Sequence, residues 1–148
     1  MDCNIIEIIP GLFISDSSAI QCEHNLNNFN INYLINLNGT LTGKSTVTYG
    51  ISYDTQLELI DSSKLINIDF NKTNDFIVKA MQSNSNILIC NVDCNVPLMI
   101  AGAFLIKYLN LSFIEAIYYI AKKINMDKIS KNICYQLFLF FTENENSQ

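Results

Sequence analysis

The side chain best placed to do chemistry in this sequence is the thiol of Cys90. It ends the apolar run 87–90, which indicates a buried strand, and a short polar loop separates it from an apolar helix expected over residues 97–109. A strand, loop and helix N-terminus together favour anions, because the N–H groups of the loop and helix point to one place. The same field favours the thiolate, the nucleophilic form of cysteine. The junction therefore indicates thiol chemistry or anion binding.

The loop itself carries groups that oppose an anion. Asp93 would place a carboxylate where the anion should sit, and like charges a few ångströms apart in a partly dry pocket repel by roughly several kcal/mol. The loop is therefore expected to oppose the binding of an anion.

Arginine is missing from the whole chain. All nine basic residues are lysines. The arginine side chain is a rigid fork of donors that grips phosphate through two hydrogen bonds, and lysine does not reproduce this geometry. A mechanism that needs an arginine to hold phosphate therefore cannot operate with this chain alone. An A/T-rich genome, of a virus or of a protist, would also explain the excess of Asn, Ile and Lys.

Composition excludes several other classes of function. The net charge of −5 argues against a nucleic-acid-binding protein, which normally carries a basic stripe. The longest apolar run, residues 96–106, is too short to cross a bilayer, so no membrane partner is expected. Cys90, Asp93 and Cys94 have no histidine nearby, since His24 is the only one, and we expect neither a metal nor a cofactor. Five cysteines without framework spacing, and a start without a basic segment, indicate a cytoplasmic protein.

The elements that must position the Cys90 junction alternate between strands and helices. Strands are expected at 5–9, 12–14, 33–37, 65–68 and 87–90, with helices at 17–26, 76–81, 97–109, 112–124 and 130–141. Residues 38–63 are expected to form a loop with an irregular strand or short helix. Ser112 and Glu115 form a capping-box pattern that opens one helix. This order predicts one α/β domain over 1–142, with a mixed sheet between helical layers and a disordered tail over 143–148.

Aromatic residues are concentrated in the last two predicted helices. Most of them are expected to pack in the core, but consecutive residues of a helix point in different directions. Some aromatic surface should therefore be exposed, and exposed apolar patches often mark partner sites. The residues concerned are Tyr118, Tyr119, Tyr135, Phe138, Phe140 and Phe141.

Four segments, in this order, resemble dual-specificity phosphatases of the cysteine-dependent superfamily. They are IIEIIPGLFISDSSAI, NINYLINLNG, ILICNVDCNVPLMIAGAFLIKYLNLSFIEAI and ISKNICYQLFLF, and together they cover most of the chain. The third is similar to the family pattern "vlVHC-x-x-G-x-x-R-S", which is followed by Ala-Tyr-Leu. The spacing from Ala103 places Cys90 at the position of the family's nucleophile. The resemblance implies a central mixed sheet flanked by helices.

The same resemblance implies that the catalytic apparatus is lost. The arginine that grips the phosphoryl oxygens corresponds to Val96, which has neither charge nor a side-chain donor, and the loop glycine corresponds to Asp93. The resemblance therefore implies a degenerate phosphate loop with weak or absent phosphate binding, made of Cys90, Asn91, Val92, Asp93, Cys94, Asn95 and Val96. Ile89 replaces the histidine before the nucleophile, and Pro97 replaces the serine after the arginine. The family's Asp general acid, on a loop some thirty residues before the cysteine, falls nearest Lys72, with Asp69 and Asp75 out of register.

We therefore expect a pseudophosphatase that acts as a protein-binding scaffold or assembly module. Small poxvirus phosphatases of this family are homodimers, so a homodimer and a viral origin are expected by the same resemblance. One alternative is a repurposed thiol enzyme that uses Cys90 for chemistry on substrates other than phosphates. Another is a phosphatase completed by an arginine from a partner chain.

Overall fold

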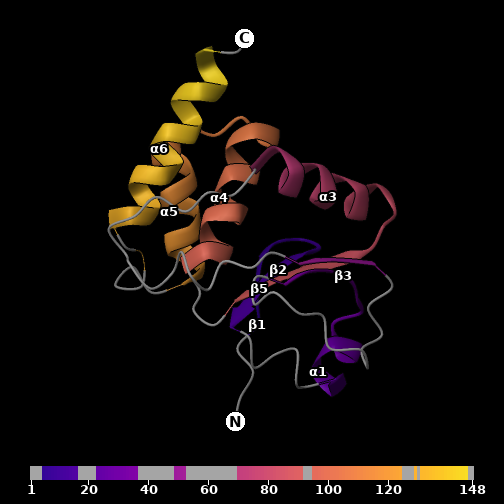
Figure 1. Cartoon of the computed structure of the whole chain (residues 1–148). Helices are drawn as coiled ribbons and strands as arrows, with labels where there is room; N and C mark the ends of the chain where they lie inside the picture. The colour runs from indigo at the N-terminus through magenta and orange to yellow at the C-terminus, as the bar shows by residue number, and fades with distance from the viewer. Residues whose placement is uncertain are drawn as a thin grey trace.

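A computed structural model of the chain describes residues 5–16, 23–36, 49–52, 70–91, 95–124, 129 and 131–146. Figure 1 shows the arrangement of its helices and strands. In chain order these are β1 (Ile5–Ile9), β2 (Leu12–Asp16), α1 (Glu23–Asn28), β3 (Ile31–Asn36), β4 (Tyr49–Ser52), α3 (Phe70–Gln82), β5 (Asn86–Asn91), α4 (Asn95–Tyr108), α5 (Phe113–Lys123) and α6 (Lys131–Asn146).

The five described strands form one mixed sheet in the order β1-β2-β5-β3-β4. β1 pairs antiparallel with β2, and every other neighbouring pair is parallel. Helices α3, α4, α5 and α6 lie on one side of this sheet, and α1 lies on the other (Figure 1). The predicted α/β class, with a mixed sheet between helical layers, is confirmed.

Strand β5 is central and contributes to an apolar cluster on each face of the sheet. Alternate side chains of a strand point to opposite faces. Ile87 and Ile89 therefore join the large cluster under α3 to α6, whereas Leu88 and Cys90 join a small cluster with Leu26 of α1. This alternation decides what surrounds the thiol of Cys90.

Helix α4 is the centre of the large cluster, as its apolar sequence predicts. All side chains over residues 96–106 are buried. Gly102 allows α6 to approach closely, because a Cβ at this position would lie 2.7 Å from Cδ1 of Leu137. The helix is therefore enclosed by its neighbours over most of its length.

The capping box of α5 forms as predicted. The backbone N–H of Glu115 donates to Oγ of Ser112 at 3.1 Å, and the backbone N–H of Ser112 donates to Oε1 of Glu115 at 3.0 Å. Hydrogen bonding to the Glu115 carboxyl by the backbone N–H of Ser112, and then by the Ser112 side chain, lowers the pKa of Glu115. The two bonds of the capping box mark the start of α5 at Phe113.

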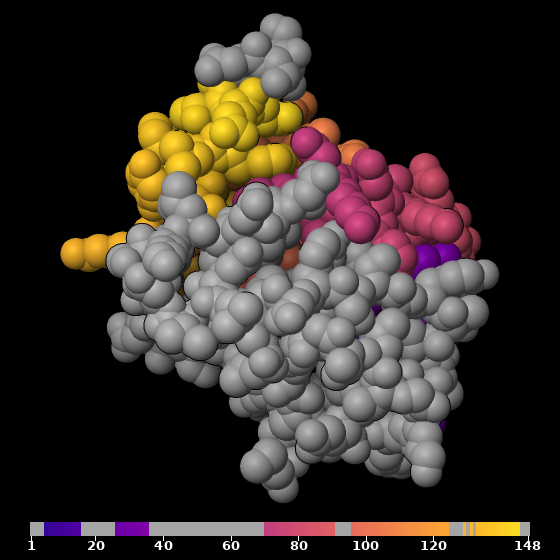
Figure 2. All heavy atoms as spheres, viewed as in Figure 1, coloured from indigo at the N-terminus to yellow at the C-terminus, as the bar shows by residue number. Residues whose placement is uncertain are grey.

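Two helices are longer than the sequence indicated. α3 begins at Phe70 rather than at residue 76, because Phe70 packs edge-on against Phe140 of α6 with ring centroids 5.4 Å apart. Figure 2 shows the start of α3 beside α6 at the surface. α6 continues to Asn146, beyond the helix end expected at 141, and the domain boundary after residue 142 stays a prediction. The strand expected at 65–68 and most of the helix expected at 17–26 lie outside the described residues.

None of the helices that the structure describes combines the length and the apolar character that a bilayer span needs.

Asn74 is a polar residue in the core of the helical layer. Its side chain is fully buried on α3, and neither its amide nitrogen nor its amide oxygen meets a hydrogen-bond partner among the described residues. A buried polar group left without a partner costs about 1–3 kcal/mol. The burial of the Asn74 amide therefore lowers the stability of the fold.

We expect Asn74→Leu to raise the free energy of unfolding by about 1–3 kcal/mol, because leucine has the same branched arrangement of side-chain heavy atoms and needs no partner. Urea denaturation followed by circular dichroism measures this change. Asn71→Leu, one turn earlier on the exposed face of α3 where Asn71 accepts from Nζ of Lys107 at 2.9 Å, should bring no such gain. Destabilisation by Asn74→Leu would contradict this interpretation.

Candidate functional site

The predicted site lies where β5 passes into α4, at the carboxyl edge of the parallel strands. In the sheet Cys90 is paired with Ser15 of β2 and with Asn36 of β3, so all three strands end together. Open α/β sheets bind ligands at this edge. The strand and the helix on either side of the loop are present, with Asn91 last in β5 and Asn95 first in α4. Val92, Asp93 and Cys94 lie outside the described residues.

The thiol of Cys90 is fully buried. Its exposed fraction is 0%, and Sγ donates a weak hydrogen bond to the backbone oxygen of Ile35 at 3.7 Å. The rest of its cluster is apolar and comprises Phe13, Leu26, Ile31, Leu34 and Leu88. A substrate can therefore reach the sulfur only if the groups that cover it move.

Val96, at the position of the family's arginine, is a core residue. Its exposed fraction is 0%, and it belongs to the large cluster formed by α3 to α6 and the upper face of the sheet. An arginine at this place would need its guanidinium to reach solvent or an anion. The side chain present instead contributes to packing at the first turn of α4.

Cys90 and Val96 therefore belong to different clusters on opposite faces of the sheet. A phosphate-binding loop needs the nucleophile and the arginine to converge on one phosphoryl group. In this chain the two positions instead complete two separate apolar cores. The described part of the junction keeps the strand and the helix expected of an anion site, but the side chains of Cys90 and Val96 do not converge.

The residues next to these two positions are also apolar. Ile89, at the family's histidine position, is fully buried in the large cluster. Pro97 is buried in the first turn of α4, where its missing N–H costs little because that group has no partner within the helix. The replacements identified from the sequence are therefore compatible with a stable helix start.

The expected register of the general acid is corrected by the structure. Lys72 lies inside helix α3 with an exposed side chain, not on a loop that follows a strand. The described strand next to β3 is β4, and it ends at Ser52. The acidic residues that follow β4 in the sequence include Asp54 and Asp61, which lie outside the described residues. The loss of the general acid stays a prediction.

Asp75 is excluded as a general acid by its place in the fold. It is exposed on α3 and accepts a hydrogen bond from the hydroxyl of Tyr108 at 3.5 Å. Tyr108 is the last residue of α4, about 20 Å along the helix axis from the junction with β5. The pKa of Tyr108 is raised mainly by its partial burial and, to a smaller extent, by the negative charge of Asp75. Asp69, the other expected candidate, lies outside the described residues.

Other reactive groups in the described part of the chain do not form a second site. Burial raises the pKa of Cys134, the other described free thiol, which lies half-buried on α6. No group of three His, Cys, Asp or Glu side chains with the arrangement of a metal site occurs within the described ranges. The absence of a metal or cofactor from the function stays a prediction.

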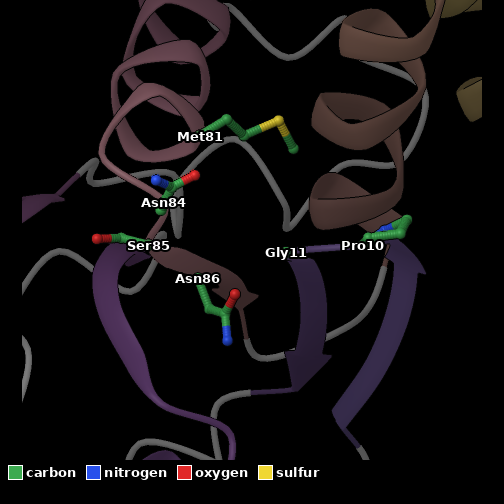
Figure 3. Close-up of a pocket in the computed structure, with 6 residues that line it drawn as sticks. All are labelled: Pro10, Gly11, Met81, Asn84, Ser85 and Asn86. Carbon is green, nitrogen blue, oxygen red and sulfur yellow. The ribbon is translucent and has the colours of Figure 1, made fainter.

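A hollow of about 330 Å³ lies at the opposite end of β5 from Cys90. Figure 3 shows it between the turn from β1 to β2 and the segment that joins α3 to β5. Asn86 is held there by a hydrogen bond from Nδ2 to the backbone oxygen of Phe29 at 2.7 Å. Its described lining contains no acid or base that could activate the hydroxyl of Ser85, and it comprises Pro10, Gly11, Met81, Asn84, Ser85 and Asn86. This hollow therefore offers no catalytic chemistry.

Comparison with solved structures identifies the fold of this chain. No family model and no curated protein sequence matches this chain. The chain is similar in structure to a leucine-rich-repeat and phosphatase domain protein from Entamoeba histolytica (20% identity, TM-score 0.80, covering 98% of this chain and 95% of that one). It is also similar to human DUSP28 (13% identity, TM-score 0.79, covering 98% of this chain and 97% of that one). A third similar structure is that of a human tyrosine phosphatase-like serine/threonine/tyrosine-interacting protein (18% identity, TM-score 0.78, covering 97% of this chain and 96% of that one). The fold is that of dual-specificity-phosphatase-like proteins.

We expect Cys90 to resist alkylation in the native protein. Because the thiol is fully buried, iodoacetamide should modify it on the order of 100-fold more slowly at neutral pH than in urea, where the cluster is opened. Peptide mass spectrometry distinguishes it from the other four cysteines, and half-buried Cys134 on α6 is the internal reference. Fast modification of native Cys90 would contradict the geometry described above.

We expect Val96→Arg to lower the free energy of unfolding by more than about 3 kcal/mol, because it buries an unpaired charge in the core. Leu109→Arg is the matched control, since Leu109 is 48% exposed directly after α4 and should tolerate the same side chain. Urea denaturation compares the two. Equal stability of both variants would show that position 96 has access to solvent.

Proposed function

We propose that this chain is a member of the dual-specificity phosphatase family that has lost phosphate-ester hydrolysis and acts by binding protein partners. The observation that carries this proposal is the burial of Val96 in the core at the position of the phosphate-gripping arginine. The absence of arginine from the chain supports it, because no other residue of the same chain can supply a guanidinium. The enclosed thiol of Cys90 supports it as well.

A binding role agrees with what the rest of the molecule offers. One structural neighbour is described as a phosphatase-like interacting protein, so this fold is compatible with a role in interaction. Among the described large apolar side chains, several on α5 and α6 are exposed, and such surfaces often mark partner sites. A scaffold or assembly module would use these surfaces away from the old phosphate loop.

The alternative of thiol chemistry at Cys90 requires that a reagent reach the sulfur. The alkylation measurement described above separates the two proposals, because an enzyme of this kind needs a fast-reacting native thiol. A cytoplasmic location and a viral or protist origin stay predictions.

The first test of the proposed function is hydrolysis of an aryl phosphate. We expect the unmodified protein to be no faster than Cys90→Ser, and we expect Val96→Arg alone not to restore turnover, since Asp93 still opposes the dianion. Product release is followed by absorbance, with an active phosphatase of the same fold as the positive control. Cleavage by the unmodified protein that disappears in Cys90→Ser would overturn the proposal.

The second arm of this test is binding. Partners captured from the native host by the full chain should also be captured by Cys90→Ser, and added phosphate or vanadate should not release them. This result follows if partners contact surfaces away from residue 90. Capture that is competed by vanadate, or lost in Cys90→Ser, would place the binding in the old phosphate loop instead.

A further inference from the structure

The outward face of α5 carries two exposed apolar residues and two charged residues. Ile114 and Tyr118 are one turn apart and are 65% and 63% exposed, whereas Ala116 and Ile120 on the opposite side of the helix are buried. The charged residues, Glu115 and Lys122, lie on either side of Tyr118 along the helix. We call the set of Ile114, Glu115, Tyr118 and Lys122 the α5 outer face.

From this face we propose that a second copy of this chain binds α5, with the two α5 helices antiparallel about a twofold axis near Tyr118. The proposal rests on the proposed binding function and names its partner. Each helix contributes the same face, so one set of side chains must be complementary to itself.

Charge complementarity selects this arrangement. Glu115 and Lys122 are seven residues apart, about 10 Å along the helix, and Tyr118 lies midway between them. A twofold axis at the midpoint brings Glu115 of each copy opposite Lys122 of the other, which forms two identical ion pairs. Antiparallel helices also align their dipoles favourably. A parallel arrangement would place equal charges opposite each other.

The surface beside Tyr118 has room for an incoming side chain. A groove of about 210 Å³ is lined by Leu111, Glu115, Tyr118, Tyr119 and Lys122. This volume is below the range of about 300–1,000 Å³ that is typical of small-molecule sites. It is better suited to one aromatic side chain, such as Tyr118 of the second copy, and the twofold relation would fill both grooves at once.

The face is partly pre-organised in the single chain. Nζ of Lys122 lies 4.6 Å from the ring centroid of Tyr118, a cation–π contact that holds both side chains near the groove. Glu115 is held at its position by the capping box with Ser112. Side chains that are already restrained lose less conformational entropy on association.

Helix α6 extends the apolar surface next to α5. Phe138 is 43% exposed and contacts Phe113 of α5 with ring centroids 5.1 Å apart, and Tyr135 one turn earlier is 53% exposed. Figure 1 shows α5 and α6 side by side in the helical layer. A stable pair of proteins buries about 800 Å² on each partner, more than one helix face provides. The residues on α6 supply additional apolar area for this contact.

The oligomeric state of the full chain tests the proposal. Sedimentation velocity should give a dimer at micromolar concentration, and Tyr118→Glu should give a monomer with an unchanged circular dichroism spectrum. Lys122→Glu should raise the dimer Kd about tenfold, because the twofold axis doubles every change of charge. Lys123→Glu, the neighbouring residue whose Nζ lies 5.9 Å from the ring centroid of Tyr119, is the matched control and should leave the Kd unchanged.

A double charge exchange identifies the pairing. Glu115→Lys alone should weaken the dimer, and Glu115→Lys with Lys122→Glu should restore it, because the two ion pairs then form with reversed sign. Ser112→Ala breaks the same capping box without changing the charge, so it should leave the dimer intact and exclude fraying of the helix as the cause.

A monomer at about 100 µM, which corresponds to binding weaker than about 5.5 kcal/mol, would overturn the proposal. A dimer that is insensitive to both Tyr118→Glu and Lys122→Glu would overturn it too, since the contact would then lie elsewhere. Capture of a different protein by a monomeric chain through the same face would overturn the second copy as partner while leaving the proposed function standing. Aryl-phosphate turnover, measured independently of mass, would instead overturn the proposed function.

Discussion

The burial of helix α4 is the constraint on which the rest of the structure depends. Its side chains over residues 96–106 are all buried, and α3, α5 and α6 pack around it on one face of the sheet. The helix begins immediately after the loop that follows β5, so its depth in the core fixes where the site residues can point. A side chain that packs under three helices cannot also present a guanidinium group to a ligand.

The same constraint bears on the proposed loss of phosphatase chemistry. An active site with a guanidinium and a thiolate close together stores unfavourable desolvation and charge, and it is usually less stable than a packed alternative. In this chain Val96 fills a place in the large cluster, and Cys90 fills a place in the smaller cluster beside Leu88. Under the proposed function, the fold would therefore be relieved of that unfavourable energy and could keep the strand and the helix of the junction.

The sequence predicted elements well where local signals and burial agreed. The apolar run of α4, the capping box at Ser112 and Glu115, and the turn between β1 and β2 each have a short-range cause, and each is found where expected. Prediction failed at the start of α3, because the segment after Phe70 is polar and its helix is held by the contact of Phe70 with Phe140, far along the chain. Because residues 70–75 were expected to be a loop and not part of α3, the position of the general acid was predicted nearest Lys72. A parallel strand as short as β4 leaves a weak periodic signal, and only its pairing with β3 reveals it.

By itself the sequence determined the class of fold, the place of the thiol at a strand–helix junction, and the absence of any arginine to complete a phosphate site. These follow from residue identity and local spacing, which need no distant contact. Only the tertiary structure decided that Cys90 and Val96 face different cores, that Asp75 lies at the far end of α4, and which aromatic residues of α5 and α6 remain exposed. Each of these depends on the face that a strand or helix turns toward its neighbours, which is set by packing between segments far apart in the chain.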